Sequence, residues 1–167
     1  DRAAKMLRDA GVAEGTKITL SYQLDSTLEE EMAILVQAAW KDIGLDVELE
    51  KVPAATFFDR LFKREFQAVL WRANAICPDP GYVQALFFHG SSFINSGGYD
   101  NPKVNELIDK SMAGFGADEA ISDARMDLMR QCQAELMEDP PWVYLGFHGP
   151  LHAIRDWVKG WVWYSQT

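Results

Sequence analysis

Helical and strand patterns alternate through the first 71 residues of this 167-residue chain, which constrains its fold more than any other feature. The strand patterns cover residues 17–23, 45–52 and 67–71, and helical patterns at residues 3–11, 26–44 and 53–62 precede them. The last strand pattern is continuously apolar, as expected for a strand that is covered on both faces. Because helices and strands alternate, the strands should pair in parallel. The sequence therefore predicts an α/β fold: a mixed, mostly parallel central sheet flanked by helices.

The helix predicted at residues 26–44 has apolar residues spaced by three and four positions, which we expect to pack against the sheet. Asp25 or Ser26 can cap this helix, and the acidic residues Glu29 to Glu31 in its first turn are favoured by the helix dipole. The apolar stripe consists of Leu28, Met32, Leu35, Val36, Ala39, Trp40 and Ile43.

The second half of the chain predicts more helices and one strand. Asn101 is expected to cap a helix that ends near Met112, and Asp118 to begin a long helix that ends at Asp139. Further segments are a helix at 83–88, a Gly/Ser loop at 90–98, a strand at 142–147 and an extended segment at 157–164. We find no repeat and no linker, so residues 1–167 are predicted to form a single domain.

Charge and length exclude several classes of protein. The net charge is −9, with 25 acidic and 16 basic residues and no basic cluster, so nucleic-acid binding is not expected. No apolar run approaches the roughly 20 residues that a membrane-spanning helix needs. No signal peptide precedes Asp1 and the chain opens directly in a helical pattern, so we interpret it as a fragment of a longer protein.

The two cysteines do not form a disulfide framework at this length. Cys132 lies on the apolar face of a predicted helix and is expected to be a small core residue, whereas Cys77 lies in a polar loop. Sequence leaves a bridge between them open. His148 and His152 are separated by Gly149 and Pro150, so they are not expected to bind a metal ion as a helical pair.

Six short motifs follow one another in an order that resembles the second lobe of family 5 extracellular solute-binding proteins, which serve peptide, nickel and opine ABC importers. The resemblance covers essentially the whole chain. The motifs are Asp9-Ala10-Gly11, Ile43-Gly44-Leu45, Trp71 with Asp79-Pro80, Gly98-Tyr99-Asp100-Asn101-Pro102-Lys103-Val104, Glu138-Asp139-Pro140-Pro141-Trp142, and Val158-Lys159-Gly160.

This resemblance implies a periplasmic-binding-protein-like lobe that closes on a small, peptide-like solute together with an absent opposing lobe. It implies no cofactor. The parent protein would be exported, either periplasmic or otherwise extracytoplasmic or held by a lipid anchor, and would deliver its small-molecule or peptide ligand to an ABC permease in the membrane. Nothing in the sequence singles out nickel.

The resemblance also points to ligand-binding residues. Trp71 occupies the position of a tryptophan beside the ligand, and the alternative is a rim aromatic that packs on its neighbours. Peptide-binding members carry an aspartate three residues later, where this chain has Asn74, which supplies no charge. A shifted alignment would assign that role to Asp79, which is equally expected to cap a helix before Pro80.

Three further residues are candidates on chemical grounds. Arg72 could meet a carboxylate, although on an alternating strand its side chain points away from Trp71. Tyr82 and His89 could line a cleft with flat surfaces. For Phe88, near them in the sequence, we expect a place in the core.

Motifs of catalysis are missing from the sequence: it has no G-x-S-x-G, H-E-x-x-H or P-loop. We therefore expect a binding protein and no enzyme. Two alternatives remain: a free-standing protein-interaction domain without a transport role, and a hydrolase with an unrecognised site.

Overall fold

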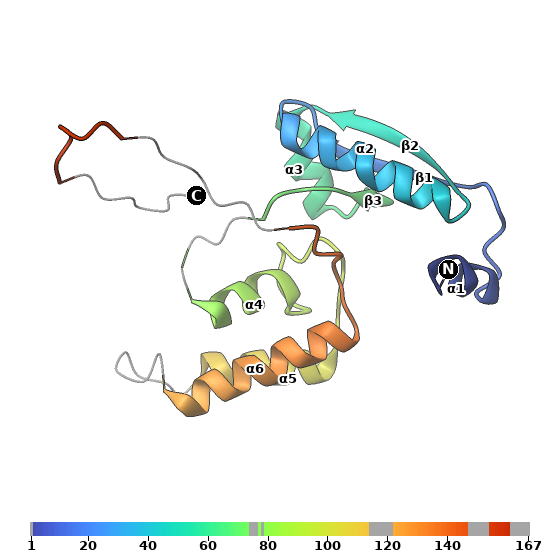
Figure 1. Ribbon diagram of the computed structural model, residues 1–167. Helices are drawn as coiled ribbons and strands as arrows, with labels where there is room; N and C mark the ends of the chain where they lie inside the picture. Colours follow the sequence, from blue (N-terminus) through green and yellow to red (C-terminus); the bar gives the residue numbers. More distant parts are fainter. Residues whose placement is uncertain (1, 74–76, 78, 114–121, 147–153, 161–167) are drawn as a thin grey trace. The chain divides into compact units, whose positions relative to one another are not determined.

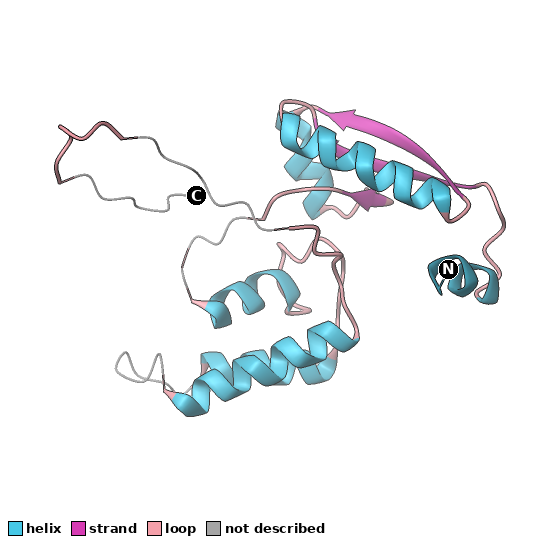
Figure 2. Ribbon diagram, in the orientation of Figure 1, coloured by secondary structure: helices cyan, strands magenta, loops and turns pink. Residues whose placement is uncertain are grey.

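The computed structural model describes residues 2–73, 77, 79–113, 122–146 and 154–160. It divides the chain into two compact units, Asp1–Ala73 and Asn74–Thr167. The first unit contains the alternating helices and strands, and the described part of the second contains helices and loops (Figure 2). That residues 1–167 form a single domain stays a prediction.

The first unit contains a parallel three-stranded sheet with the order β2-β1-β3 (Figure 1). The pairing of β1 with β2 runs from Thr16 beside Leu45 to Gln23 beside Val52, and β3 pairs with β1 at Leu20 and Ser21. The elements are α1 (Arg2–Asp9), β1 (Thr16–Gln23), α2 (Thr27–Asp42), β2 (Leu45–Val52), α3 (Ala54–Phe62) and β3 (Ala68–Val69). The predicted α/β class is thereby confirmed, and all described strands are parallel.

Two apolar clusters cover the two faces of this sheet. On the α2 side, Leu20, Tyr22, Leu45 and Val47 pack with Ala33 of α2. On the other side, Val52 packs with Phe57 and Leu61 of α3. Alternate residues at β3 divide between the two clusters, with Ala68 and Leu70 in the first and Val69 and Trp71 in the second. The prediction that this strand is covered on both faces is confirmed, although β3 is only two residues long.

Helix α2 begins where the sequence predicts, with Ser26 at the N-cap accepting a hydrogen bond from the backbone N–H of Glu29. Its predicted apolar stripe is wrong in part, because Leu28, Leu35 and Ala39 are exposed while Ala33 is completely buried. Apolar residues occur nearly all round this helix, so their spacing does not define one face. The face that packs against the sheet contains Ala33, with the partly buried Val36, Trp40 and Ile43 beside it.

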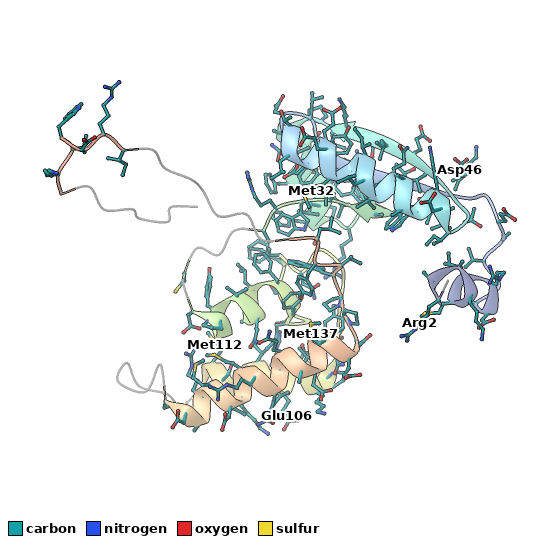
Figure 3. The ribbon with its side chains drawn as sticks, viewed as in Figure 1. Arg2, Met32, Asp46, Glu106, Met112 and Met137 are labelled. Carbon is teal, nitrogen blue, oxygen red and sulfur yellow. The ribbon has the colours of Figure 1, made fainter. Side chains whose placement is uncertain are left out.

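The second unit contains α4 (Pro80–Phe88), α5 (Pro102–Met112) and α6 (Asp123–Glu138). Helices α5 and α6 lie side by side and antiparallel, since Lys103 pairs with Glu135 at one end and Arg125 donates to the carbonyl of Ser111 near the other (Figure 1). The exposed side chains of Met112 and Met137 lie towards opposite ends of this pair (Figure 3).

Asn101 caps α5, as the sequence predicts. Its side chain accepts hydrogen bonds from the backbone N–H groups of Lys103 and Val104. The long helix α6 begins at Asp123 with Ser122 at its N-cap, and the predicted start at Asp118 lies outside the described residues. Its buried face contains Cys132, as predicted, together with Met129 and Leu136.

The strand predicted at residues 142–147 is wrong for residues 142–146, which form no strand, and residue 147 lies outside the described residues. Trp142 instead packs on Phe87 and Phe88 of α4, with ring centroids 5.2 and 4.9 Å apart. The exposed side chains of Val143 and Tyr144 follow it. The predicted extended segment 157–164 lies partly outside the described residues. No helix in the described part of the chain is both long and apolar enough to cross a membrane.

Candidate functional site

The three parallel strands of the first unit end at one edge of the sheet, which we call the carboxyl edge: residues 23–25, 52–53 and 70–72. Backbone hydrogen bonds extend beyond the strands there, from Leu24 N–H to the carbonyl of Val52 and from Leu70 N–H to that of Ser21. Ligands in open α/β sheets bind at this kind of edge. Trp71 and Arg72 therefore lie where a solute site is expected.

Trp71 is partly buried and packs on the cluster of Val52, Phe57 and Leu61, on the α3 side of the sheet. This contact places one part of the indole against the core and leaves another part accessible. The packing interpretation of Trp71 is compatible with ligand contact, because a fixed aromatic side chain presents a defined surface.

Arg72 is exposed. Because successive residues alternate between the two faces of a sheet, it belongs to the face opposite that of Trp71. Its positive charge acts on the carboxylate of Glu29, in the first turn of α2. Glu29 is only 7% exposed. Burial raises the pKa of Glu29, and hydrogen bonds from the backbone of Gln23 and Arg72, with the Arg72 charge, offset part of this increase.

Sequence reasoning missed the burial of Glu29. The residue stands in a run of three glutamates at a helix start, which reads as a solvated first turn. In the structure Glu29 is buried, whereas Glu30 is only partly buried and pairs with Lys51 at 2.5 Å.

Asp79 is the N-cap of α4, and its Oδ1 accepts a hydrogen bond from the N–H of Tyr82 at 2.9 Å. The capping interpretation is confirmed. The same carboxylate also receives two hydrogen bonds from Arg125, which hold the pKa of Asp79 below its ordinary value. Asn74, the other candidate for the amine-binding role, lies outside the described residues.

Arg125 was not singled out by the sequence, and it ties the helices of the second unit together. Its side chain is 8% exposed. Besides the pair with Asp79, its Nε donates to the carbonyl of Ser111 in α5 at 2.8 Å. A charge at an otherwise apolar position of α6 is thus satisfied by partners from the start of α4 and the end of α5.

His89 follows α4 and is held in a local network. Its Nδ1 accepts a hydrogen bond from the backbone N–H of Ser91 at 3.1 Å, and its Nε2 lies 3.3 Å from Oδ1 of Asp109. Tyr82 is partly buried in the first turn of α4. Phe88 is 6% exposed, which confirms its expected place in the core.

The candidate residues divide between the two units. Trp71 and Arg72 adjoin each other at the carboxyl edge of the first unit, and Asp79, Tyr82 and His89 belong to α4 and its ends in the second. Their assignment to ligand binding stays a prediction. Within the described residues, no group of three or more His, Cys, Asp or Glu side chains could hold a metal ion.

Comparison with curated proteins finds relatives along most of the chain. It is 25% identical over 160 residues to the oligopeptide-binding protein OppA of Bacillus subtilis, covering 93% of this chain and 28% of the relative. It is also 25% identical over 162 residues to the probable D,D-dipeptide-binding periplasmic protein DdpA of Escherichia coli, covering 95% and 30%. The chain thus spans less than a third of the length of these relatives.

Solved structures share the fold. DppA from Helicobacter pylori, solved in complex with the peptide STSA, matches with a TM-score of 0.73 at 22% identity, over 84% of this chain and 27% of that one. HbpA2 from Haemophilus parasuis matches with a TM-score of 0.74 at 20% identity, over 84% and 28%. Similarity at this level of identity shows the fold alone.

The profile of the family described as "Bacterial extracellular solute-binding proteins, family 5 Middle" matches residues 1–95, more than half of the chain. This match includes the whole parallel sheet, the carboxyl edge with Trp71, and helix α4. The chain therefore belongs to the family 5 bacterial extracellular solute-binding proteins.

Proposed function

We propose that this chain is the second lobe of the substrate-binding component of an ABC importer, and that it contributes one side of a hinged cleft. The observation that carries the proposal is the position of Trp71 at the carboxyl edge of the sheet of a family 5 protein. Relatives named as oligopeptide- and dipeptide-binding proteins support a peptide-like solute.

The physical basis of capture is closure around the solute. One lobe buries only part of a ligand, so affinity arises mainly when a second lobe swings over it. The first unit suits this role, because its two apolar clusters cover both faces of the sheet and one of them packs against Trp71. We expect the isolated chain to bind a solute weakly and the parent protein to bind it tightly.

The amine-binding role in such a cleft falls more naturally to Asn74 than to Asp79. Both carboxylate oxygens of Asp79 already accept hydrogen bonds from Arg125, and Oδ1 also caps α4. An amide at residue 74 binds an ammonium without charge compensation, which favours solutes whose affinity depends little on a free amino terminus.

The parent protein would act outside the cytoplasm, free in the periplasm or held by a lipid anchor, and would pass its solute to a membrane permease. The family consists of binding proteins. We propose no catalytic step for this chain.

The test uses the full-length parent purified under native conditions. Mass spectrometry of the solute that it carries should identify a peptide or a related compound, and added peptides of two to five residues should raise its melting temperature by several degrees. The 167-residue chain alone should show little or no shift. An equal shift in the isolated chain would contradict the two-lobed cleft. Stabilisation by nickel ions alone, or by a protein partner alone, would contradict the peptide-like solute.

A further inference from the structure

Helix α2 has apolar residues on two faces, and the sheet covers only one of them. The inner face packs against the sheet through Ala33, which is completely buried, and through Trp40. On the other side of the helix, Leu35 is 70% exposed and Ile34 51%. The outer face of α2, as we use the term, consists of five exposed apolar residues: Leu28, Ile34, Leu35, Ala38 and Ala39.

This outer face lacks the charges that the solvent side of a helix normally carries. Residues 32–40 contain no charged side chain, although charged residues make up 25% of the whole chain. A helix with apolar residues all round normally lies inside a protein, covered on more than one side. Single apolar residues are common at protein surfaces, whereas a contiguous group of them marks an interface. We therefore expect the outer face of α2 to be covered in the complete protein.

The side chains of the outer face have a shape that fits another helix. Ala38 follows Ile34 by four residues, and Ala39 follows Leu35 by four, so each row has a large side chain beside a small one. Helices pack by inserting such rows into the grooves of a neighbouring helix.

Glu31 gives this surface one charge with a fixed position. It is exposed and lies three residues after Leu28 and four before Leu35, which places the three on the same side of α2. Among the residues that the structure describes, Glu31 forms no ion pair, whereas Glu30 pairs with Lys51. A helix that covers this side of α2 would meet the carboxylate best with a basic residue.

The size of the outer face indicates that its partner belongs to the same polypeptide. Five side chains on one helix offer an area on the order of a few hundred Å², whereas separate proteins that associate stably bury roughly 800 Å² each. A second copy of the chain, or a free protein, would therefore bind only weakly through this face. A segment of the same polypeptide needs less area, because its covalent connection keeps it at a high effective concentration.

Proteins of this family contain polypeptide that could supply such a segment. The chain covers 28% of OppA and 30% of DdpA, and the family description calls the matched region "Middle". A membrane surface is a poorer partner, because anionic lipid headgroups would repel Glu31 and a chain with a net charge of −9.

We propose that the outer face of α2 is the docking surface for an amphipathic helix of the parent protein that lies outside residues 1–167. This helix presents apolar side chains to Ile34 and Leu35 and a lysine or arginine to Glu31. The contact fastens α2, and with it the sheet, to the remainder of the parent. The inference goes beyond the proposed function, because it involves neither the solute nor Trp71, and its test uses no ligand.

The first experiment is photo-crosslinking in the full-length parent, with p-benzoylphenylalanine in place of Leu35. The control carries the same photoprobe in place of Asp59, an exposed residue of α3 on the opposite side of the sheet. Mass spectrometry of the digested product should show the probe at residue 35 attached, within one polypeptide, to a peptide outside residues 1–167. That peptide should have apolar residues at helical spacing and a lysine or arginine, and the probe at residue 59 should not reach it.

Three results of this experiment would each overturn the proposal: attachment to a second copy of the protein, attachment only within residues 1–167, and no attachment from residue 35.

The second experiment compares melting temperatures of the parent and of the 167-residue chain. Leu35→Glu should lower the melting temperature of the parent by at least about 4 °C and leave that of the chain within about 1 °C. Glu31→Lys should also lower it in the parent only, because it brings two basic residues together. The matched charge reversal Glu48→Lys, at an exposed residue of β2, should lower neither.

If the parent with Leu35→Glu does not fold, Leu35→Ala decides by the same comparison, since it only removes apolar contact. Equal shifts of melting temperature in the parent and in the isolated chain would show that the outer face meets solvent in both, and the proposal would then be wrong.

Discussion

Arg125 and Asp79 form a two-point ion pair, with Nη1 of Arg125 2.8 Å from Oδ2 of Asp79 and Nη2 2.9 Å from Oδ1. The arginine side chain is 8% exposed and the aspartate 28%. A guanidinium buried this deeply depends on its partner, because it would otherwise remain desolvated without compensation. The pair joins the residue that starts α4 to the buried face of α6.

Replacing Asp79 by alanine should destabilise the chain by about 2–4 kcal/mol, since it leaves the guanidinium of Arg125 unpaired and removes the cap of α4. The free energy of unfolding in urea measures this. The matched control is Asp59→Ala, which breaks the exposed pair with Lys63 and should cost less than about 1 kcal/mol. Equal losses in the two variants would show that the Arg125 pair is no stronger than a surface pair.

The same pair should make stability depend on acid pH. Hydrogen bonds from Arg125 lower the pKa of Asp79 in the folded chain. The stabilisation is therefore complete above the pKa of about 3.9 that an aspartate has in an unfolded chain, and it is lost as the pH falls through the lower folded value. The difference in unfolding free energy between the natural chain and Asp79→Asn should be constant near neutral pH and shrink below about pH 4. A difference that grows on acidification would contradict this assignment.

Replacing Trp71 by phenylalanine in the full-length parent should weaken solute binding at least tenfold, because the smaller ring presents less aromatic surface at the carboxyl edge. Stability should fall by only about 1 kcal/mol, since phenylalanine retains most of the packing on Phe57 and Leu61. Titration calorimetry with the solute carried by the parent provides the measurement. Trp157→Phe, at a side chain 75% exposed, is the control. If Trp71→Phe bound the solute with unchanged affinity, Trp71 would have a packing role and no role in solute binding.

The two cysteines should differ sharply in reactivity. Both are free, Cys77 is exposed, and Cys132 is completely buried, which raises the pKa of its thiol to about 11. A thiol reagent at about pH 8 should therefore modify one cysteine per native chain and two in denaturant. Cys77→Ser should abolish the native reaction, whereas Cys132→Ala should leave it intact. Rapid modification of both thiols in the native chain would show that the core around Cys132 opens readily.

The packing face of α2 can be tested with two substitutions. Leu35 is 70% exposed, so Leu35→Gln should change stability by less than about 0.5 kcal/mol. Ala33 is completely buried against the sheet, so Ala33→Leu should cost about 1–3 kcal/mol through overpacking. Urea denaturation compares them directly. If Leu35→Gln destabilised the chain more than Ala33→Leu, the face predicted from the apolar spacing would be the one that packs against the sheet.

Much of the local structure follows from the sequence. The alternating strand at 45–52, the capping residues Ser26 and Asn101, and the burial of Cys132 all depend on short-range patterns, and the structure contains them. The local sequence determines which backbone geometry each segment prefers and where a helix can begin. The same patterns, in order, were sufficient to indicate the family.

Pairings between distant residues decided the rest. Which side of α2 packs, why Arg125 lies inside, and why Glu29 is buried while Glu30 is not all depend on the groups that the fold brings beside them. Trp142 joined an aromatic cluster with Phe87 and Phe88, although its segment has a strand pattern. A sequence pattern contains the preferences of single residues, whereas burial and charge pairing are properties of surfaces that meet only in the folded chain.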